Sequence, residues 1–281
     1  MAQKALNQVP VPQARIIAIS NNKGGTGKTT TAMNLAGALV LKERRVLVID
    51  LDPQCNASIT FNVIIDANVA TSRGVRRLLS DEKASVAECV YPRGKFCDFI
   101  PSDPDLNDIH TKLSIEPKGR MRLREHLRKI SGDYDFILLD CPPDMGAFTQ
   151  SALVAATEVI IPLDVGFLSV AGLARIVNII QEIQTHYNPD LKILGVLATK
   201  YDSRTSLSEE MMTELRTYNL PLFNTKIRIS VDIIRSQAAR QPVSIYAPSC
   251  HAAIDYNELA EEILPAKVIP LRQRKRQAAN S

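Results

Sequence analysis

The sequence lacks the features that mark membrane, disulfide-rich and metal-cluster proteins. No apolar run reaches the roughly 18 residues of a transmembrane helix. The five cysteines form no Cys-x-x-Cys pair, which argues against a disulfide framework, a zinc knuckle and an iron–sulfur cluster. The N-terminal residues have no apolar core of a secretory signal. A reducing cytoplasm is therefore the expected compartment.

The composition is that of a globular protein with a local excess of positive charge. Hydrophobic residues make up 45% and charged residues 23% of the 281 positions, enough to bury a sizeable core in one or two domains. The formal net charge is +4, and all of the excess lies after residue 264. Those last residues form either a solvated tail or a contact for a polyanion. The basic residues of this tail are Lys267, Arg272, Arg274, Lys275 and Arg276.

The order of apolar runs predicts an α/β fold with a doubly wound, mostly parallel sheet. The runs are continuous rather than alternating, which is typical of strands covered on both faces. We expect a flexible N-terminal arm over 1–14, one domain over 15–264 and a basic tail over 265–281. Residues 60–100 give no clear pattern. Asp103 followed by Pro104 predicts a helix start with the Asp103 carboxylate as its cap. The predicted strands are 15–20, 46–50, 136–140, 159–163 and 193–199, and the predicted helices are 28–43, 104–113, 119–130, 146–157, 170–186 and 206–217.

A glycine-rich stretch between the first strand and the first helix indicates a phosphate loop. Glycines allow successive backbone N–H groups to point at one anion, and the helix that follows adds the positive end of its dipole. Lys28 can then reach the β- and γ-phosphates, and the Thr29 hydroxyl can ligate Mg²⁺. The plainer alternative is a tight connection without a ligand. The predicted nucleotide-binding residues are Lys23, Gly24, Gly25, Thr26, Gly27, Lys28, Thr29 and Thr30.

The form K-G-G-T-G-K-T resembles the deviant Walker A motif of the ParA/MinD superfamily of ATPases. Asn22 replaces the usual first glycine, and Lys23 follows it. The resemblance implies a P-loop fold, ATP and Mg²⁺ as cofactors, and a homodimer when ATP is bound. In that family the early lysine, here Lys23, reaches the partner's nucleotide. A second cation there would stabilise the charge that develops in phosphoryl transfer.

Two further motifs resemble the same family. The segment D-L-D-P-Q-C-N resembles its D-x-D-P-Q-x-N segment, with Cys55 in place of glycine; this implies that Asp52 orients the attacking water and that Asp50 supports the metal site. The segment Y-D-F-I-L-L-D-C-P-P matches its Walker B strand, so Asp140 would hold Mg²⁺ directly or through water. The resemblance thus assigns Lys23, Lys28 and Asp52 to catalysis, and Thr29, Asp50 and Asp140 to the metal.

The resemblance also implies the function of a partition protein. ParA proteins bind DNA nonspecifically as ATP-bound dimers on the nucleoid, and a ParB-like adaptor stimulates their weak ATPase. The resemblance points to Arg204 and Arg228 as DNA contacts. Other basic residues are further candidates on charge alone, and the absence of interleaved aromatics favours contacts to the DNA backbone. These candidates are Arg235, Arg240, Arg272, Arg274, Lys275 and Arg276.

Several alternatives stay open at this point. The same engine could position a protein cargo such as a carboxysome or a chemotaxis cluster instead of a plasmid or chromosome. A membrane-bound MinD-like protein would need an amphipathic C-terminal helix, which Pro265 and Pro270 interrupt, so no membrane partner is expected. A nucleotide switch without hydrolysis would use the same loop. Residues 1–14 are too short for a helix-turn-helix domain, so we expect no operator binding.

Overall fold

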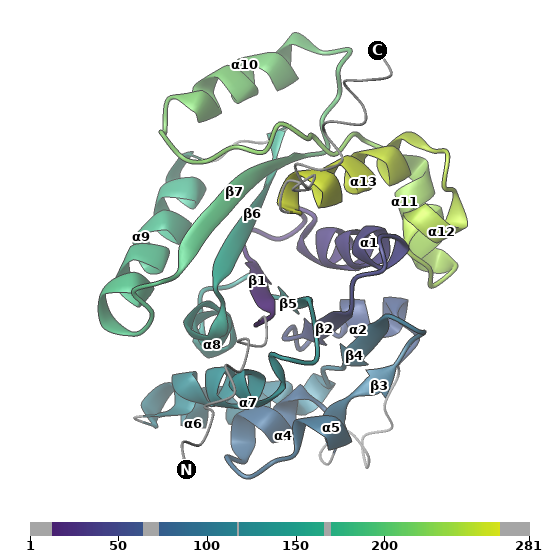
Figure 1. The fold of residues 1–281 in the computed structure, drawn as a ribbon. Coiled ribbons are helices and arrows are strands. Elements are labelled where there is room, and N and C mark those ends of the chain that lie inside the picture. Colours follow the sequence, from purple (N-terminus) through teal and green to yellow (C-terminus); the bar gives the residue numbers. More distant parts are fainter. Residues whose placement is uncertain (1–12, 64–72, 117, 166–169, 265–281) are drawn as a thin grey trace, which may run out of the picture.

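The computed structural model describes residues 13–63, 73–116, 118–165 and 170–264. Its centre is a seven-stranded sheet in the order β3-β4-β2-β5-β1-β6-β7 (Figure 1). Every pairing is parallel except that of β3 with β4. The predicted doubly wound sheet is therefore confirmed. The strands are β1 (Arg15–Ile19), β2 (Val46–Asp50), β3 (Tyr91–Pro92), β4 (Cys97–Ile100), β5 (Phe136–Asp140), β6 (Glu158–Asp164) and β7 (Lys192–Thr199).

Alternate side chains of the central strands enter two separate cores. In β1, Ile16 and Ala18 belong to one core, whereas Ile17 and Ile19 belong to the other. The neighbouring strands β2 and β5 divide in the same way. Successive residues of a strand point to opposite faces, so a strand covered on both faces needs apolar residues at every position. This explains the continuous apolar runs of the sequence.

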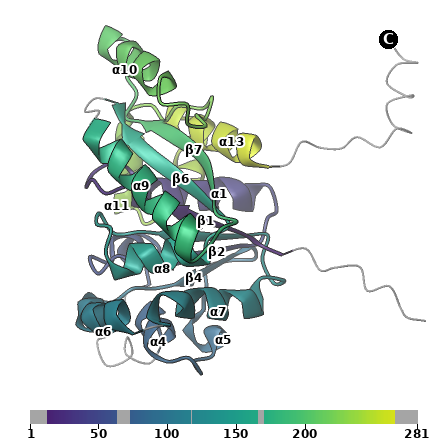
Figure 2. The same ribbon diagram turned by 90° about the vertical axis from the view of Figure 1, so that its left-hand side faces the viewer.

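The helices form a layer on each face of the sheet. One core contains residues of α1 (Lys28–Leu41), α2 (Asn56–Thr60), α12 (Val243–Tyr246) and α13 (His251–Ile263), with α11 (Val231–Ala238) packed beside it. Figure 2 shows α10 at the opposite end of the molecule from α4 and α7. The other core takes up α4 (Val75–Ser80), α5 (Val86–Cys89), α6 (His110–Ile115), α7 (Arg122–Ile130), α8 (Ala147–Ala155), α9 (Val170–His186) and α10 (Ser206–Arg216).

The observed elements differ from the expected ones where the chain is cut into short pieces. Residues 60–100, which carry no clear sequence pattern, contain α4, α5, β3 and β4. The predicted helix over 104–113 is a 3₁₀ turn followed by α6, and Asp103 makes no capping hydrogen bond. Its carboxylate instead lies 3.7 Å from Arg76. An ion pair between elements has thus replaced the local cap that the sequence predicted.

Most of the two predicted terminal segments, 1–14 and 265–281, lies outside the described residues, and both remain predictions. Gln13 and Ala14 are described: Gln13 is exposed, whereas Ala14 is buried and its N–H donates to the Ser131 carbonyl at 2.8 Å. Within the described ranges, no helix has both the length and the apolar character needed to cross a bilayer.

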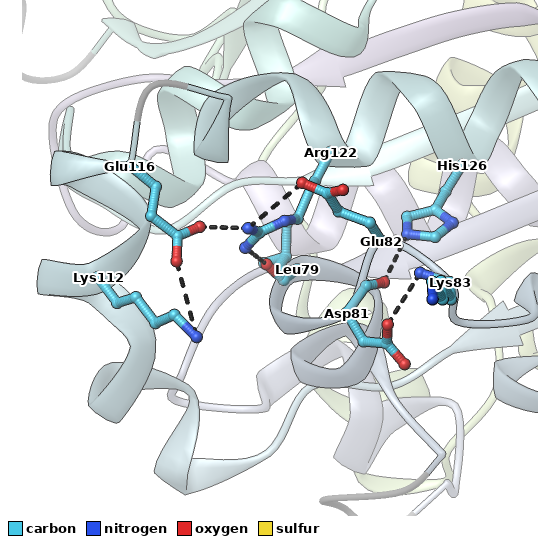
Figure 3. A network of polar contacts seen from close by, with 8 residues as sticks. All are labelled: Leu79, Asp81, Glu82, Lys83, Lys112, Glu116, Arg122 and His126. Atoms are coloured by element: carbon cyan, nitrogen blue, oxygen red, sulfur yellow. Dashed lines mark hydrogen bonds and ion pairs between the residues drawn. The ribbon is translucent and has the colours of Figure 1, made fainter.

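A buried arginine joins the short helices of the second layer (Figure 3). The Arg122 guanidinium donates to the Leu79 carbonyl at 2.8 Å and to the Glu116 carboxylate. Glu82 lies 3.8 Å from the same group. Since a buried guanidinium needs partners for its donors, Arg122, the first residue of α7, connects the end of α4 to the segment that follows α6.

Helix α1 approaches the segment at the start of α12 closely at Gly37. A Cβ added there would lie 2.5 Å from Pro242 Cβ and 2.9 Å from Ser244 Oγ. One turn earlier, the Asn34 side chain accepts the Val243 N–H at 2.7 Å. The start of α12 is therefore fixed directly against the helix that follows the phosphate loop.

Replacing Gly37 with alanine should destabilise the protein by about 1–3 kcal/mol, because the added methyl group has no space and α12 must shift. Gly24→Ala is the matched control, since its Cβ would meet nothing within 4 Å. Urea unfolding followed by circular dichroism measures both variants. Equal stabilities for the two would show that α1 and α12 do not pack this closely.

Candidate functional site

The register of the central strands brings the three sequence motifs to one edge of the sheet. Asp140, the last residue of β5, pairs with Asp50 of β2 and with Ile19 of β1. The glycine-rich loop leaves β1 at the same edge, and ligands of parallel sheets bind at the carboxyl ends of the strands. Strand pairing thus places two carboxylates beside the loop.

The loop has the backbone geometry of an anion cradle. Gly25 and Gly27 have φ angles of 75° and 87°, values that glycine adopts without strain. Gly27 directly precedes α1, so the first free N–H groups of that helix point out of the loop. Thr199 supports the loop from β7, because its hydroxyl donates to the Thr26 carbonyl at 2.9 Å.

Lys28 is the buried cation of the site. Lys28 as a whole residue is only 7% exposed, and its ammonium donates to the Lys23 carbonyl at 2.9 Å. Burial lowers the pKa of Lys28, and the nearby carboxylate of Asp140 opposes that change. A buried ammonium with a single neutral acceptor still has donors to give, so Lys28 is suited to bind an anion above the loop.

Asp140 is the buried carboxylate of the site. It is fully buried, and neither oxygen has a hydrogen-bond partner of ordinary geometry among the described residues. Burial, together with the charge of Asp50, raises the pKa of Asp140 well above its usual value, while the nearby Thr29 hydroxyl opposes the rise. An orphaned buried carboxylate beside a hydroxyl fits a hard cation that takes oxygen ligands. Asp140 and Thr29 could therefore hold Mg²⁺, and the metal roles predicted for them stay predictions.

Asp50 connects the strand edge to α2. One oxygen accepts the Asp52 N–H at 3.0 Å, and the other accepts the Ser58 N–H at 2.9 Å and the Ser58 hydroxyl at 2.7 Å. Burial raises the pKa of Asp50 to about 6. Both oxygens thus serve the backbone around α2, and the metal role predicted for Asp50 stays a prediction.

Asp52 precedes α2 and lines a cavity that lies over the glycine-rich loop. It is 6% exposed, its carboxylate accepts the Gln54 N–H at 2.9 Å, and burial raises its pKa while Lys28 opposes the rise. Cys55 follows with a left-handed φ of 56° at the start of α2. A desolvated carboxylate beside a cation can orient a water molecule.

A cavity of about 540 Å³ lies over the loop, the size of a small-molecule site. Most of the residues that the sequence predicted for nucleotide binding line it, but Lys23 and Thr26 do not. Gln54, Lys200 and Gln237 are among the lining residues that the sequence did not predict. The lining residues are Gly24, Gly25, Gly27, Lys28, Thr29, Thr30, Asp52, Gln54, Asn56, Ile59, Thr60, Pro143, Lys200 and Gln237.

Two of these missed residues come from distant parts of the chain. Lys200 follows β7 with a φ of 51°, and its ammonium lies 2.9 Å from Asp164 at the end of β6. Gln237 of α11 donates from its amide to the Thr30 hydroxyl at 3.1 Å. No sequence motif specified either residue, because both reach the cavity only through the fold.

The predicted DNA contacts do not form one cluster of equivalent side chains. The Arg204 side chain is 85% exposed, and it pairs with Asp202 at 2.7 Å. Arg228 is 35% exposed and donates to Asp255, a carboxylate that is only 3% exposed. Arg228 thus fixes the segment before α11 to α13, a structural role that the sequence analysis did not foresee.

The remaining candidates lie at the end of α11 or outside the described residues. Arg235 is 65% exposed and lies 3.4 Å from Asp232. Arg240 is exposed, has a φ of 56°, and donates to the Asn62 side chain. The tail candidates Arg272, Arg274, Lys275 and Arg276 lie beyond residue 264, so their DNA contacts remain predictions.

Replacing Asp140 with asparagine should stabilise the protein without ligands by about 2 kcal/mol at neutral pH, because a neutral amide replaces a desolvated carboxylate. The pKa of Asp140 is raised in the folded state, so wild-type stability falls as the pH rises through that value. The gain from Asp140→Asn should therefore grow with pH. Urea unfolding across a pH series measures it, with the exposed Asp133→Asn as control. A loss of stability in Asp140→Asn would contradict this.

Comparison with known proteins agrees with the geometry. The family model of an AAA domain matches residues 14–193. The chromosome partitioning protein ParA of Myxococcus xanthus is 34% identical, over 89% of this chain and 88% of its own. The sporulation initiation inhibitor protein Soj of Bacillus subtilis is 32% identical, over 89% and 98%.

A solved structure adds the ligand chemistry of a relative. Cobyrinic acid a,c-diamide synthase from Mycobacterium smegmatis, with bound ATP analogue and magnesium, is 31% identical with a TM-score of 0.75, over 88% of this chain and 93% of its own. This chain thus resembles partition proteins in sequence. It also has the parallel sheet, the loop between β1 and α1 and the two strand-end carboxylates described above. This chain belongs to the ParA/MinD-type partition ATPases.

Proposed function

We propose that this protein hydrolyses ATP with Mg²⁺, dimerises around the nucleotide, and positions DNA with a ParB-like partner. The observation that carries the proposal is that the buried Lys28 ammonium and the orphaned, buried Asp140 carboxylate influence each other's charge beside an open glycine loop. Lys28 donates to a neutral carbonyl, so a phosphate would supply it with an anion. The Asp140 oxygens have no hydrogen-bond partner among the described residues, so Mg²⁺ would supply them with a cation. The relatives named ParA and Soj support the partition role.

Binding follows from the positions of the loop groups. The N–H groups at the start of α1 and the Lys28 ammonium would hold the phosphates, while Asp140 and Thr29 would hold Mg²⁺. The bound metal would neutralise charge on the phosphate oxygens. Lys200 and Gln237 line the same cavity from the side of β7 and α11, and they would contact the nucleoside.

Hydrolysis requires placement of a water molecule more than covalent chemistry. Asp52 lines the cavity, and its carboxylate would orient that water toward the terminal phosphate. Asp50 positions Asp52 indirectly, because it accepts the Asp52 N–H and holds Ser58 of α2. Movement of α2 would therefore move the residue that orients the water.

Dimerisation would depend on Lys23. Lys28 lines the cavity of its own chain, but Lys23 does not. The Lys23 carbonyl accepts the Lys28 ammonium at 2.9 Å, which fixes the backbone from which the Lys23 side chain starts. A second copy facing the cavity would receive this side chain as a further cation near its own triphosphate. ATP binding and dimerisation would then be one event.

Lys23→Ala should bind a nonhydrolysable ATP analogue with Mg²⁺ but stay monomeric, because the cation between subunits is lost. Wild type and Lys192→Ala, an exposed lysine away from the loop, should both dimerise. Asp52→Ala should dimerise and release no phosphate. Light scattering measures the mass, and a phosphate-release assay measures turnover.

Two results would contradict the proposal. A wild-type protein that remains monomeric with saturating analogue and Mg²⁺ would exclude the dimer. Phosphate release at the wild-type rate from Asp52→Ala would remove the water-orienting role of that carboxylate. Assays run with and without DNA and a ParB-like partner would show whether turnover is weak alone and stimulated by them.

Nonspecific DNA binding would use exposed basic side chains that contact phosphates. Arg204 and Arg235 are both well exposed, and surface ion pairs such as theirs cost little to exchange for a phosphate. DNA binding by the ATP-bound dimer would place the protein on the nucleoid. The cargo that this chemistry favours is a plasmid or a chromosome.

Removing Arg204 and Arg235 together should weaken DNA binding of the nucleotide-bound dimer and reduce the slope of log affinity against log salt by about 0.9 for each lost phosphate contact. Arg216→Ala, at the exposed end of α10, should leave the slope unchanged. Fluorescence anisotropy of a labelled duplex over a salt series measures this. A slope identical to wild type in the double variant would mean that other residues contact the DNA.

A further inference from the structure

A second cavity lies behind α2, separate from the cavity over the phosphate loop. Its volume is about 230 Å³. The walls come from α1, the end of α2, the turn between β3 and β4, and the segment between α11 and α12, which lie along one side of the molecule (Figure 1). None of the sequence motifs points to this place.

The floor of this second cavity is apolar and firmly supported. Met33 and Val40 of α1 contribute to it, with Pro242 and Ile245 from the α12 side. Phe61 closes the wall near α2, and its ring stacks on Phe99 at 4.6 Å between centroids. The packing of α1 against Pro242 at Gly37 holds the floor together. An apolar body entering here would lose water on several sides.

The mouth of the second cavity carries three cations. Arg93 and Lys95 come from the turn between β3 and β4, and Arg240 follows α11. The Lys95 ammonium lies 4.9 Å from the centroid of the Phe96 ring. Of the described residues that line the second cavity, none is Asp or Glu. The positive charge therefore calls for an anionic ligand.

The second cavity shares structural elements with the nucleotide site. Thr60, the last residue of α2, lines both cavities. At the end of α11, Gln237 lines the first cavity and Arg240 the second. A ligand held in the second cavity would thus contact two elements that also form the wall around the nucleotide.

We propose that the second cavity is a binding site for a small anion with an apolar body, and that its occupancy changes the affinity of the nucleotide site. The apolar body lies on the Phe61 and Ile245 side, and its carboxylate, phosphate or sulfonate group lies between Arg93, Lys95 and Arg240. The proposal does not depend on ATP hydrolysis or on DNA binding.

The first test uses 1-naphthalenesulfonate as the anionic probe and 1-naphthalenemethanol as its neutral counterpart. The chain has no tryptophan, so no indole emission overlaps with that of the naphthalene when its fluorescence anisotropy is followed. The sulfonate should bind one to one and at least about ten-fold more tightly than the alcohol, because the mouth attracts the anion. Equal affinities, or no saturable binding of the sulfonate, would overturn the proposal.

Two independent variants locate the site. Arg93→Ala with Lys95→Ala removes two cations, and Ile245→Glu places a carboxylate at a position that is 53% exposed. Each should weaken sulfonate binding by about ten-fold or more. Ile254→Glu, at a 40% exposed isoleucine of α13 outside both cavities, is the matched control. Circular dichroism checks folding. Unchanged binding in the cation variant would overturn the assignment.

The coupling is tested by repeating the titration with a saturating nonhydrolysable ATP analogue and Mg²⁺. The sulfonate affinity should change by at least about three-fold, and the nucleotide affinity should change by the same factor when the sulfonate is saturating. Identical sulfonate affinities with and without the analogue would overturn the coupling. The variants would then decide the binding site by themselves. Their result does not depend on whether the protein proves to be an ATPase.

Discussion

The pairing of β1, β2 and β5 is the constraint on which the rest of the site depends. Asp50 and Asp140 are partners in register, and Ile19, the last residue before the loop, is paired with Asp140. A shift by one residue would turn these side chains to the opposite faces of the sheet. The two-sided apolar packing of the strands excludes such a shift, because both cores would lose their fit. The hydrophobic core therefore fixes the geometry of the charged site.

The site holds charged groups in a state that costs stability. Lys28 and Asp140 are both buried. Burial lowers the pKa of Lys28 and raises the pKa of Asp140, so it favours the neutral form of each group. Buried groups of this kind are tolerated where a ligand completes them. A metal–nucleotide complex bearing both signs of charge would relieve the two costs together. Through Asp50 and Ser58, the same edge also holds α2, so completion of the site and the position of α2 are connected.

Local sequence predicted the loop well because its chemistry is local. Gly25, Gly27 and Lys28 act through backbone freedom and one helix start, which a short motif specifies. Gln237 enters the cavity only through the packing of α11 on α1, and no local pattern records that contact. The capping role predicted for Asp103 was wrong for the same reason, since an ion pair with a distant element replaced the local bond. The short elements between residues 60 and 100 likewise owe their form to tertiary packing.

The most direct test of this account is hydrogen exchange of backbone amides with and without a nonhydrolysable ATP analogue and Mg²⁺. Bound phosphates should protect the N–H groups of residues 24–29 from exchange. The amides of Asp52 and Ser58, which donate to the Asp50 carboxylate, should also exchange more slowly. The same experiment without Mg²⁺ should leave α2 unprotected. Protection confined to other parts of the sheet, with residues 24–29 exchanging as fast as before, would contradict the account.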